Sequence, residues 1–306
     1  MRRVMAICGP TAVGKSEVAE RVADLVGAEI VSVDSMQVYR GMDIGTAKVP
    51  EAERRCPLHM VDVVDVSVPY AVAEFQRDAR ACVEDIAERG LVPILCGGTG
   101  LYLDAVVDEM DFPKGEATDS RRAAYEAQLE AIGPDALHQI LADRDPKSAA
   151  EIHPNNTRRV IRALEMLDEG VSYSEQRKGL KRHEPHFEVE LFVLTMDRET
   201  LYARIDRRVE LMFEQGLVDE VRTLEGQGLA ESHTASQAIG YKEVLQYLRG
   251  EISEREALTL VQKNTRRYAK RQLSWLRRDG RATWIDVGDV SRADAAEAIA
   301  RKWRQP

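Results

Sequence analysis

The stretch Gly9-Pro10-Thr11-Ala12-Val13-Gly14-Lys15-Ser16 decides the fold of this chain. Its spacing matches G-x-x-x-x-G-K-[ST], a loop whose backbone N–H groups hold phosphates. The apolar run at 3–8 predicts a buried strand before the loop, and the amphipathic pattern at 15–26 predicts a helix after it. A glycine turn at the start of a helix favours the binding of an anion. We therefore expect a polyphosphate here, with Lys15 on a phosphate oxygen and Ser16 as a ligand of Mg²⁺.

The bulk properties are those of an ordinary globular protein of 306 residues with a net charge of −9. No apolar run approaches the roughly 18 residues of a membrane span, and the N-terminal apolar run is too short for a signal peptide. The four cysteines are not spaced as zinc ligands. We expect a reduced cytoplasmic protein that does not enter a membrane.

Basic residues are concentrated in three places in spite of the negative net charge. Between 263 and 278 there are seven basic residues and no acidic one. Two smaller clusters are Arg177, Lys178, Lys181 and Arg182, and Arg158, Arg159 and Arg162. Such stripes can hold a polyanion. Solvated helix faces are the alternative, and the sequence leaves both open.

The order of elements predicts an α/β fold, with a parallel sheet flanked by helices and a small helical insertion. Short apolar runs alternate with helical patterns, as in a sheet with crossover helices. We expect strands at 4–8, 29–33, 59–64, 91–96, 188–195 and 284–287, and early helices at 15–26, 71–89 and 101–107. The pattern divides the chain into 1–112 (first part of the core), 113–186 (charged helical insertion, with breaks at Gly133-Pro134 and Asp145-Pro146) and 187–306 (the core resumed).

Polar residues follow two of these strands where ligands bind open α/β sheets. Asp34 follows the second strand, and its carboxylate suits a proton acceptor or a Mg²⁺ site through water. A capped turn is the alternative. Gln37 has a side chain suited to an adenine edge. Thr99 lies in Gly97-Gly98-Thr99-Gly100, where glycines permit close approach of a ligand or simply form a tight turn.

Two pairs of arginines are spaced to share a helix face. Arg158 and Arg162 follow a predicted turn, and their two guanidinium groups suit phosphates or stacked bases. An ion pair of Arg162 with Glu165 is the alternative. Arg204 and Arg208 could clamp a diphosphate, or pair with acidic neighbours on their helix.

Together these motifs resemble the tRNA dimethylallyltransferase, or IPP transferase, family in its bacterial form. The matching pieces span residues 9 to 277, nearly the whole chain. They are G-P-T-A-V-G-K-S, D-S-M-Q-V-Y-R-G-M-D-I-G-T-A-K, G-G-T-G-L-Y, H-P-N-N-x-R-R-V-I-R-A-L-E, I-G-Y-K-E and T-R-R-Y-A-K-R-Q-L-S-W-L-R. The phosphate loop alone is shared with many kinases, whereas the ordered combination is specific.

The resemblance implies a P-loop NTPase-like fold and transfer of a dimethylallyl group from dimethylallyl diphosphate. The acceptor is N6 of adenosine 37 in tRNAs that read codons beginning with U. It implies that residues 9–16 bind the diphosphate, that Asp34 is the general base, and that Thr99 lies near the donor and the acceptor. We also expect Arg208 to bind the diphosphate, and Lys15 and Thr99 to take part in catalysis. It further implies tRNA contacts, through the anticodon stem-loop, by Asp34, Ser35, Met36, Gln37, Thr99, Arg122, Arg158, Arg159, Val160, Ile161 and Arg162. We expect a monomer that uses Mg²⁺.

Three other functions share some of these features. A P-loop kinase acting on a small metabolite explains the loop but not the basic stripes. An RNA-binding protein with a relict loop does not explain the intact Lys15, Ser16 and Asp34. A prenyltransferase acting on free AMP is the nearest enzymatic alternative, and the charged insertion argues against it only weakly.

Overall fold

The computed structural model describes residues 1–112, 120–179 and 184–305, which form two compact units. Unit 1 contains Met1–Val107 and His186–Pro306, and unit 2 contains Asp108–Pro185. The boundaries drawn from the sequence were at 113 and 186, and residue 113 lies outside the described residues. None of the helices in the described ranges is both long and apolar enough to cross a membrane.

Unit 1 is built on a six-stranded parallel sheet in the order β3-β2-β4-β1-β5-β6. The strands are β1 (Arg3–Cys8), β2 (Ala28–Ser32), β3 (Leu58–His59), β4 (Val92–Gly97), β5 (Glu188–Thr195) and β6 (Thr283–Asp286). The phosphate loop follows central strand β1. The parallel sheet expected from the sequence, including a last strand near the C-terminus, is confirmed.

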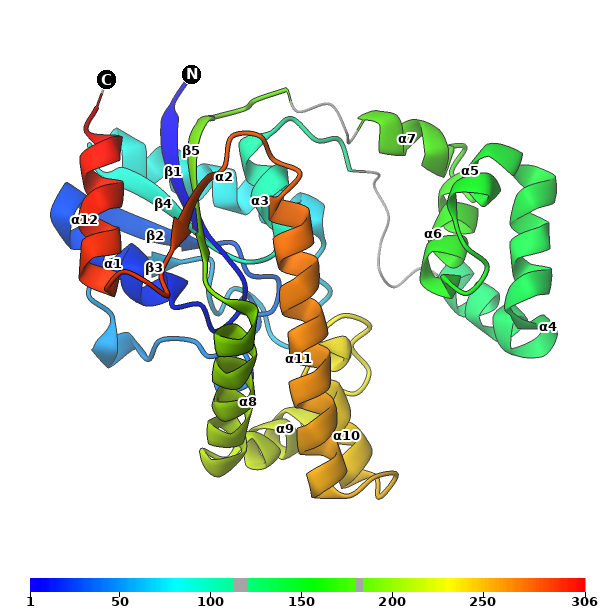
Figure 1. Ribbon diagram of the computed structural model, residues 1–306. Coiled ribbons are helices and arrows are strands. Elements are labelled where there is room, and N and C mark those ends of the chain that lie inside the picture. The colour runs from blue at the N-terminus through cyan, green and yellow to red at the C-terminus, as the bar shows by residue number, and fades with distance from the viewer. Residues whose placement is uncertain (113–119, 180–183, 306) are drawn as a thin grey trace. The chain divides into compact units, whose positions relative to one another are not determined.

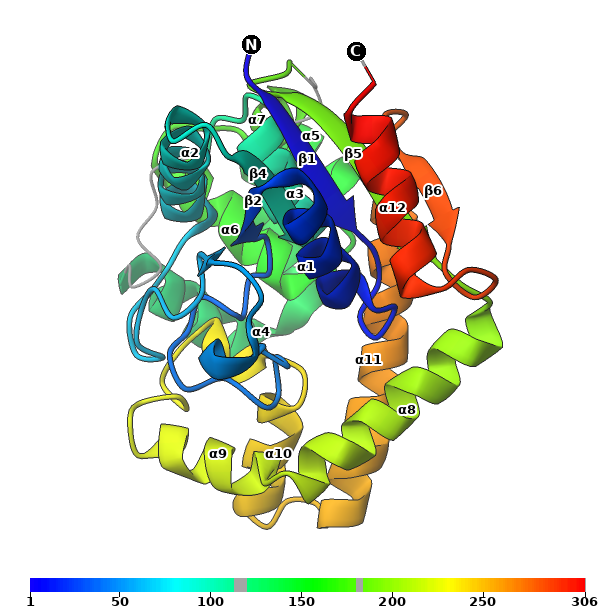
Figure 2. The same ribbon diagram turned by 90° about the vertical axis from the view of Figure 1, so that its left-hand side faces the viewer.

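The two faces of the sheet carry separate apolar layers because side chains alternate along each strand. Val4 and Ala6 of β1 pack into one layer with α2 (Val72–Glu88) and α3 (Gly100–Val107). Met5 and Ile7 face the other layer, which contains α1 (Lys15–Val26) and α12 (Arg292–Trp303). Figure 2 shows α1 and α12 side by side on this second face. Both faces of β1 are therefore buried, as its continuous apolar run requires.

The remaining helices of unit 1 lie beyond the carboxyl ends of the strands, as Figure 1 shows. They are α8 (Arg198–Glu214), α9 (Leu217–Glu225), α10 (Tyr241–Leu248) and α11 (Glu254–Leu276), with the short turns η1 (Glu51–Glu53) and η2 (Ala235–Gln237). Ligands of open α/β sheets bind at this end. The long helices α8 and α11 are thus placed to form walls of a site there.

One predicted strand is much shorter than expected. The sequence predicts a strand at 59–64, but β3 ends at His59. Met60 and Asp62 have positive φ values of 59° and 55°, which a strand cannot contain. The backbone N–H of Asp62 instead donates to the carbonyl of Gln37. The backbone of this segment is therefore bonded to the loop that follows β2 and does not continue the strand.

Unit 2 is helical, as the sequence predicts for the insertion. It contains α4 (Ser120–Arg144), α5 (Pro146–Glu151), α6 (Thr157–Asp168) and α7 (Tyr173–Gly179). Gly133 interrupts α4 with a φ of 81°, at the predicted Gly133-Pro134 break. Asp145 caps α5 by accepting a hydrogen bond from the Ser148 N–H, with Pro146 at the first helical position. Leu137, Leu141, Val160, Ile161 and Leu164 are among the residues of its own apolar core.

Candidate functional site

The phosphate loop joins β1 to α1, as its sequence predicts. Gly14 caps α1 with a φ of 100°, a conformation that favours glycine. Lys15 and Ser16 follow in the first turn, where helix N–H groups point outward. Burial lowers the pKa of Lys15, and the nearby Cys96 and Asp34 oppose that shift. The loop therefore presents a helix N-terminus and a partly desolvated ammonium group, both of which favour a bound anion.

Further cations gather around this loop. The Nη1 of Arg208 lies 3.5 Å from the Thr11 hydroxyl, and the Nε of Arg204 donates to the Ala12 carbonyl at 3.0 Å. Burial lowers the pKa of Arg208. Among the described residues, no carboxylate lies within ion-pair distance of Lys15, Arg204 or Arg208. The pairing of Arg204 or Arg208 with acidic helix neighbours, which was the alternative drawn from the sequence, is thus absent among the described residues, and the positive charge gathered at the loop suits a diphosphate.

Arg292 is a cation at this loop that sequence reasoning missed. It begins α12, and its Nε would lie 2.7 Å from a Cβ built on Gly14. Its Nη1 donates to the carbonyl of Val287 at 2.6 Å. Its positive charge contributes to lowering the pKa of Arg204, after burial, so the two guanidinium groups are near one another. No motif surrounds Arg292, so only the fold brings it to the loop.

Asp34 and Thr99 follow neighbouring strands, β2 and β4, and lie close together. The Ser35 N–H donates to the Thr99 hydroxyl at 3.3 Å, and the Tyr268 hydroxyl is also 3.3 Å from it. One oxygen of Asp34 accepts from the Met36 N–H at 2.9 Å, so the capped turn that was one alternative for Asp34 is present. The turn fixes the carboxylate at the mouth of the sheet, and Asp34 lines the cavity described below.

The glycines around Thr99 are required by helix packing. A Cβ on Gly98 would lie 2.1 Å from the Gln272 side chain, and a Cβ on Gly100 would lie 2.1 Å from the Trp275 ring. Both partners belong to α11. The Trp275 Nε1 also donates to the buried Asp104 at 2.9 Å. These glycines therefore let α11 lie directly on the loop, a role that neither alternative drawn from the sequence foresaw.

A cavity of about 290 Å³ connects these groups. Lys15, Ser16, Thr11 and Arg208 line it at the phosphate loop, and Asp34 and Gln37 line it near β2. Two helices contribute part of its apolar wall. The residues are Ile205, Val209 and Met212 of α8, and Val261 and Tyr268 of α11. The cavity can therefore hold a phosphorylated apolar group beside a carboxylate and an amide.

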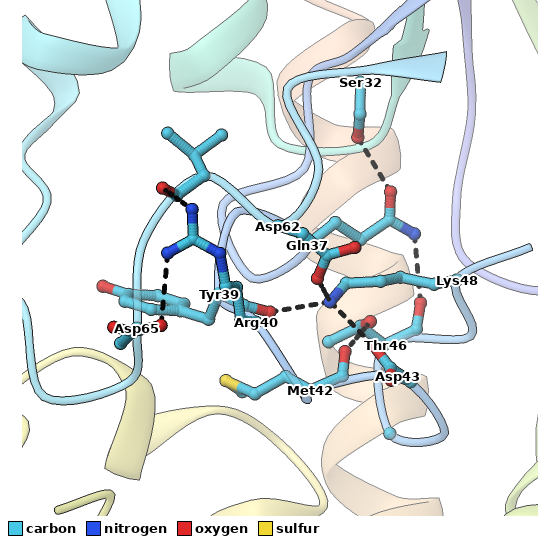
Figure 3. Close-up of polar contacts among 12 residues, drawn as sticks. Ser32, Gln37, Tyr39, Arg40, Met42, Asp43, Thr46, Lys48, Asp62 and Asp65 are labelled. Atoms are coloured by element: carbon cyan, nitrogen blue, oxygen red, sulfur yellow. Dashed lines mark hydrogen bonds and ion pairs between the residues drawn. The ribbon is translucent and has the colours of Figure 1, made fainter. Parts of the chain in front are cut away.

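The loop from Asp34 to Lys48 forms another wall of the cavity and is held by polar contacts (Figure 3). The Gln37 amide accepts from the Ser32 hydroxyl at 2.8 Å and donates to the Thr46 carbonyl at 3.2 Å. An amide has two donor hydrogens and two acceptor lone pairs. One of each is used within the protein, so Gln37 keeps a donor and an acceptor with which it could meet an adenine edge.

Lys48 anchors the far end of this loop (Figure 3). Its side chain is only 3% exposed, and its ammonium group donates to the Tyr39 carbonyl, Asp43 and Asp62 at 2.7, 2.8 and 2.6 Å. An ammonium group has three donors, so all of them are satisfied. Glu220 of α9 accepts from the N–H groups of residues 43, 44 and 45 at 3.1, 2.7 and 3.3 Å. Neither anchor could be predicted from the sequence beyond the motif itself.

The predicted RNA-binding helix of unit 2 begins at Thr157, directly after the expected turn. Arg158 and Arg159 are exposed on it. Val160 and Ile161 are 0% and 4% exposed and belong to the core of the unit. The expectation that these two contact tRNA is therefore wrong for their side chains, since those face the interior.

Two other predicted RNA contacts share a buried carboxylate. Arg122 donates to Glu165 through Nε at 2.8 Å and Nη2 at 3.2 Å, and Arg162 reaches the same carboxylate at 3.4 Å. Glu165 is 4% exposed. The intrahelical ion pair that was one alternative for Arg162 is therefore present, and Glu165 partly offsets both charges. Lys181 and Arg182, from another basic cluster, lie outside the described residues.

The oxygen donors at the phosphate loop fit a magnesium ion. Mg²⁺ in proteins usually keeps several waters and is held by one or two protein oxygens together with substrate phosphates. Ser16 offers a hydroxyl there, and Asp34 lines the same cavity. In the parts of the chain that the structure describes, no group of three or more His, Cys, Asp or Glu could hold a metal by itself. A metal here would therefore depend on the phosphates of a ligand.

The fold and the site define a P-loop α/β protein in which the phosphate loop, apolar side chains and Asp34 line one cavity, and Thr99 bonds to Ser35 of that lining. The family model described as IPP transferase matches residues 37–279, and the one described as isopentenyl transferase matches residues 2–56. The chain belongs to the IPP transferase family. This confirms the resemblance drawn from the motifs.

Similar proteins match over nearly the whole of this chain. A tRNA dimethylallyltransferase of Carboxydothermus hydrogenoformans is 46% identical over 97% of this chain and 96% of its own. The crystal structure of a tRNA isopentenylpyrophosphate transferase from Bacillus halodurans is 42% identical, with a TM-score of 0.74 over 99% of this chain and 96% of that one. A eukaryotic dimethylallyltransferase, described as acting on tRNA, is 30% identical with a TM-score of 0.79 over 97% of this chain and 77% of its own.

Proposed function

We propose that this protein transfers a dimethylallyl group from dimethylallyl diphosphate to N6 of adenosine 37, in tRNAs that read codons beginning with U. Relatives 43–47% identical along nearly the whole chain carry the name tRNA dimethylallyltransferase, which supports the proposal. The observation that carries it is the shared cavity, which joins the cations of the phosphate loop to Asp34 along an apolar wall. Such a cavity suits a prenyl diphosphate better than a nucleoside triphosphate.

The phosphate loop would hold the diphosphate of the donor. Lys15, Arg208 and the N-terminus of α1 are placed to neutralise the charge that grows on diphosphate as the C–O bond breaks. The prenyl group would lie along the apolar wall formed by α8 and α11. An allylic carbon tolerates cationic character, so stabilising the leaving group supplies a large part of the catalysis. The walls also keep out water, which would hydrolyse the donor.

Asp34 would act as the general base. The N6 amine of adenine forms a bond to the allylic carbon, diphosphate leaves, and the amine loses a proton to the Asp34 carboxylate. The amine is a weak nucleophile and barely acidic, so it needs a base only as the new bond forms. Gln37, whose amide orientation is fixed by Ser32 and Thr46, would contact the base edge. Thr99 would lie beside both substrates.

The acceptor base must leave its stack to enter the cavity, at a cost of a few kcal/mol. Recognition of single-stranded RNA loops commonly extrudes bases in this way. The exposed Arg158 and Arg159 of unit 2 would contact phosphates of the anticodon stem-loop. The proposal also includes Mg²⁺ held by Ser16 and the donor phosphates, where it would neutralise diphosphate charge. A monomeric, cytoplasmic enzyme completes it.

The test compares acceptors under identical conditions. Purified protein, Mg²⁺ and dimethylallyl diphosphate are incubated with a tRNA transcript carrying A36-A37-A38, with the same transcript carrying G37, or with AMP. Mass spectrometry of the digested nucleosides should find dimethylallyladenosine from the A37 transcript alone. Product from AMP but not from either transcript would instead identify an AMP prenyltransferase. Product from the G37 transcript would show that another adenosine is the acceptor.

A further inference from the structure

Gln272 of α11 joins two loops that otherwise belong to separate strands. Its Oε1 accepts from the N–H of Thr11 in the phosphate loop at 2.9 Å. Its Nε2 donates to the carbonyl of Gly98, beside Thr99, at 3.0 Å. The residue is 4% exposed, so water competes little for these bonds. One buried amide therefore connects the expected diphosphate site with the expected catalytic loop.

A side-chain amide is suited to this connection because it carries a donor and an acceptor. A backbone N–H donates and a backbone carbonyl accepts, so the bridging side chain must do both. Glutamate would lose the donor toward Gly98, and lysine would lose the acceptor toward Thr11. The contact is also tight, because a Cβ on Gly98 would lie 2.1 Å from the Gln272 Nε2. The orientation of the amide is thus set by both of its partners.

Tyr268 supports the same loop one helical turn earlier. Residues four apart share a helix face, and the Tyr268 hydroxyl lies 3.3 Å from the Thr99 hydroxyl. Burial raises the pKa of Tyr268 to about 12, so its phenol keeps its proton at neutral pH. Two polar side chains of α11 therefore contact residues 98 and 99. Of these two, Gln272 also contacts the phosphate loop.

We infer that Gln272 is a positioning residue, which fixes the phosphate loop relative to Thr99 and thereby holds the donor at reacting distance from the acceptor base. The inference rests on the proposed function. Both ends of the Gln272 amide are engaged with the protein, so it acts through the two loops. A misplacement of about 1 Å at a reacting centre can cost on the order of 10²-fold in rate. Loss of the bridge should therefore slow the chemical step more than it weakens binding of either substrate.

The experiment compares two variants. Gln272→Met removes both hydrogen bonds while keeping a side chain of similar size, and Gln272→Glu keeps only the acceptor. Gln262→Met is the matched control, because Gln262 lies on the same helix and donates only to the carbonyl of Asp206, at 3.3 Å. Single-turnover rates are measured at saturating dimethylallyl diphosphate and tRNA. Affinity for inorganic diphosphate is measured by calorimetry. Amide hydrogen exchange of residues 10–14 and 98–102 gives a readout that needs no activity.

Both Gln272 variants should lose about 10- to 100-fold in single-turnover rate, while diphosphate affinity changes less than about threefold. Hydrogen exchange should accelerate in both segments in Gln272→Met and in neither in the Gln262 control. A rate within twofold of wild type would overturn the inference. An equal loss of rate and diphosphate affinity would also overturn it, by making Gln272 a binding group. If wild-type protein transfers no prenyl group, the proposed function fails, and the exchange data still decide whether Gln272 couples the two loops.

Discussion

At the scale of single residues, Asp34 is the residue that we propose as the general base. One of its oxygens is held by the Met36 N–H, and its charge influences the pKa values of both Lys15 and Arg208. The carboxylate is therefore fixed in place within the electrostatic reach of the two cations that would hold the donor. This arrangement keeps the proton acceptor near the breaking bond without placing it in contact with the diphosphate cations.

Replacing Asp34 should affect turnover far more than binding. Asp34→Asn keeps an oxygen for the Met36 N–H, so the turn survives while the base is lost. We expect a loss of about 10²- to 10⁴-fold in the single-turnover rate, with tRNA affinity nearly unchanged, as for a group that acts mainly in the transition state. Single-turnover kinetics and filter binding measure the two quantities. A comparable loss of tRNA affinity would instead make Asp34 chiefly a recognition residue.

At the scale of elements, the loop from Asp34 to Lys48 forms one wall of the site. The buried ammonium group of Lys48 holds this loop in place. The ammonium group of Lys48 satisfies three acceptors, and Asp62, one of them, donates its N–H to the Gln37 carbonyl. Gln37 in turn holds the Thr46 carbonyl. The conformation of the loop and the position of the Gln37 side chain, which we expect to contact the base, therefore depend on one another.

Lys48→Met should loosen this wall. We expect KM for tRNA to rise about tenfold, since loss of roughly 1.4 kcal/mol of binding is a tenfold change, with a smaller effect on KM for dimethylallyl diphosphate. Steady-state kinetics with each substrate varied in turn measure both values. Arg40→Ala is the control, because exposed Arg40 pairs with Asp65 at the outer side of the same loop. Equal effects on both substrates, or an effect of Arg40→Ala as large as that of Lys48→Met, would contradict this account.

An element can be predicted from the sequence when the interactions that determine it lie within a few residues of one another. The helix at 15–26 and the strand at 188–195 were predicted with the bounds found, because periodicity and a glycine turn act within a few residues. The strand expected at 59–64 does not form, because the N–H of Asp62 donates to the carbonyl of Gln37, some 25 residues earlier in the chain. Gln272 and Arg292 were missed because their partners, Thr11 and Gly14, are distant in sequence. Val160 and Ile161 were assigned to RNA because a motif does not distinguish which face of its helix is buried.

At the scale of the whole molecule, basic residues are concentrated in a few clusters although the net charge is −9. The double variant Arg158→Ala, Arg159→Ala removes two exposed cations of α6. We expect weaker tRNA binding and a log K against log[salt] slope reduced by about 1 for each lost phosphate contact. Binding titrations between low and physiological salt measure the slope. Arg207→Ala is the control, because Arg207 is an exposed arginine on α8, outside the helix that is tested. An unchanged slope in the double variant would show that this face is only solvated.

The stability of unit 1 should depend on pH through Glu29. Two nitrogens of Arg89 donate to its carboxylate at 2.6 Å each, and the Nε2 of His59 lies at 2.7 Å, so the cluster ties β2 to β3 and to the end of α2. The Arg89 guanidinium is the main cause that lowers the pKa of Glu29 from 4.5 to about 2. A lowered folded-state pKa gives stability that is present above the unfolded pKa and is lost as pH falls through the folded one.

We expect wild type to exceed Glu29→Gln by about 2 kcal/mol in free energy of unfolding at pH 7, after allowing for the partly exposed Arg89. The difference should shrink as pH falls from 4.5 toward 2. Urea unfolding of both proteins across this range measures it. A difference that stays constant with pH would show that the stabilisation is not due to ionisation of Glu29.

The proposed function requires that the phosphate loop bind a prenyl donor. The most direct measurement offers the protein ¹⁴C-dimethylallyl diphosphate and γ-³²P-ATP together, at equal concentration, with Mg²⁺ and unmodified tRNA. The account predicts ¹⁴C in the tRNA, with neither ³²P transfer nor release of ³²P-phosphate. Release or transfer of ³²P without incorporation of ¹⁴C would contradict it and make the loop that of a kinase or a nucleotidase.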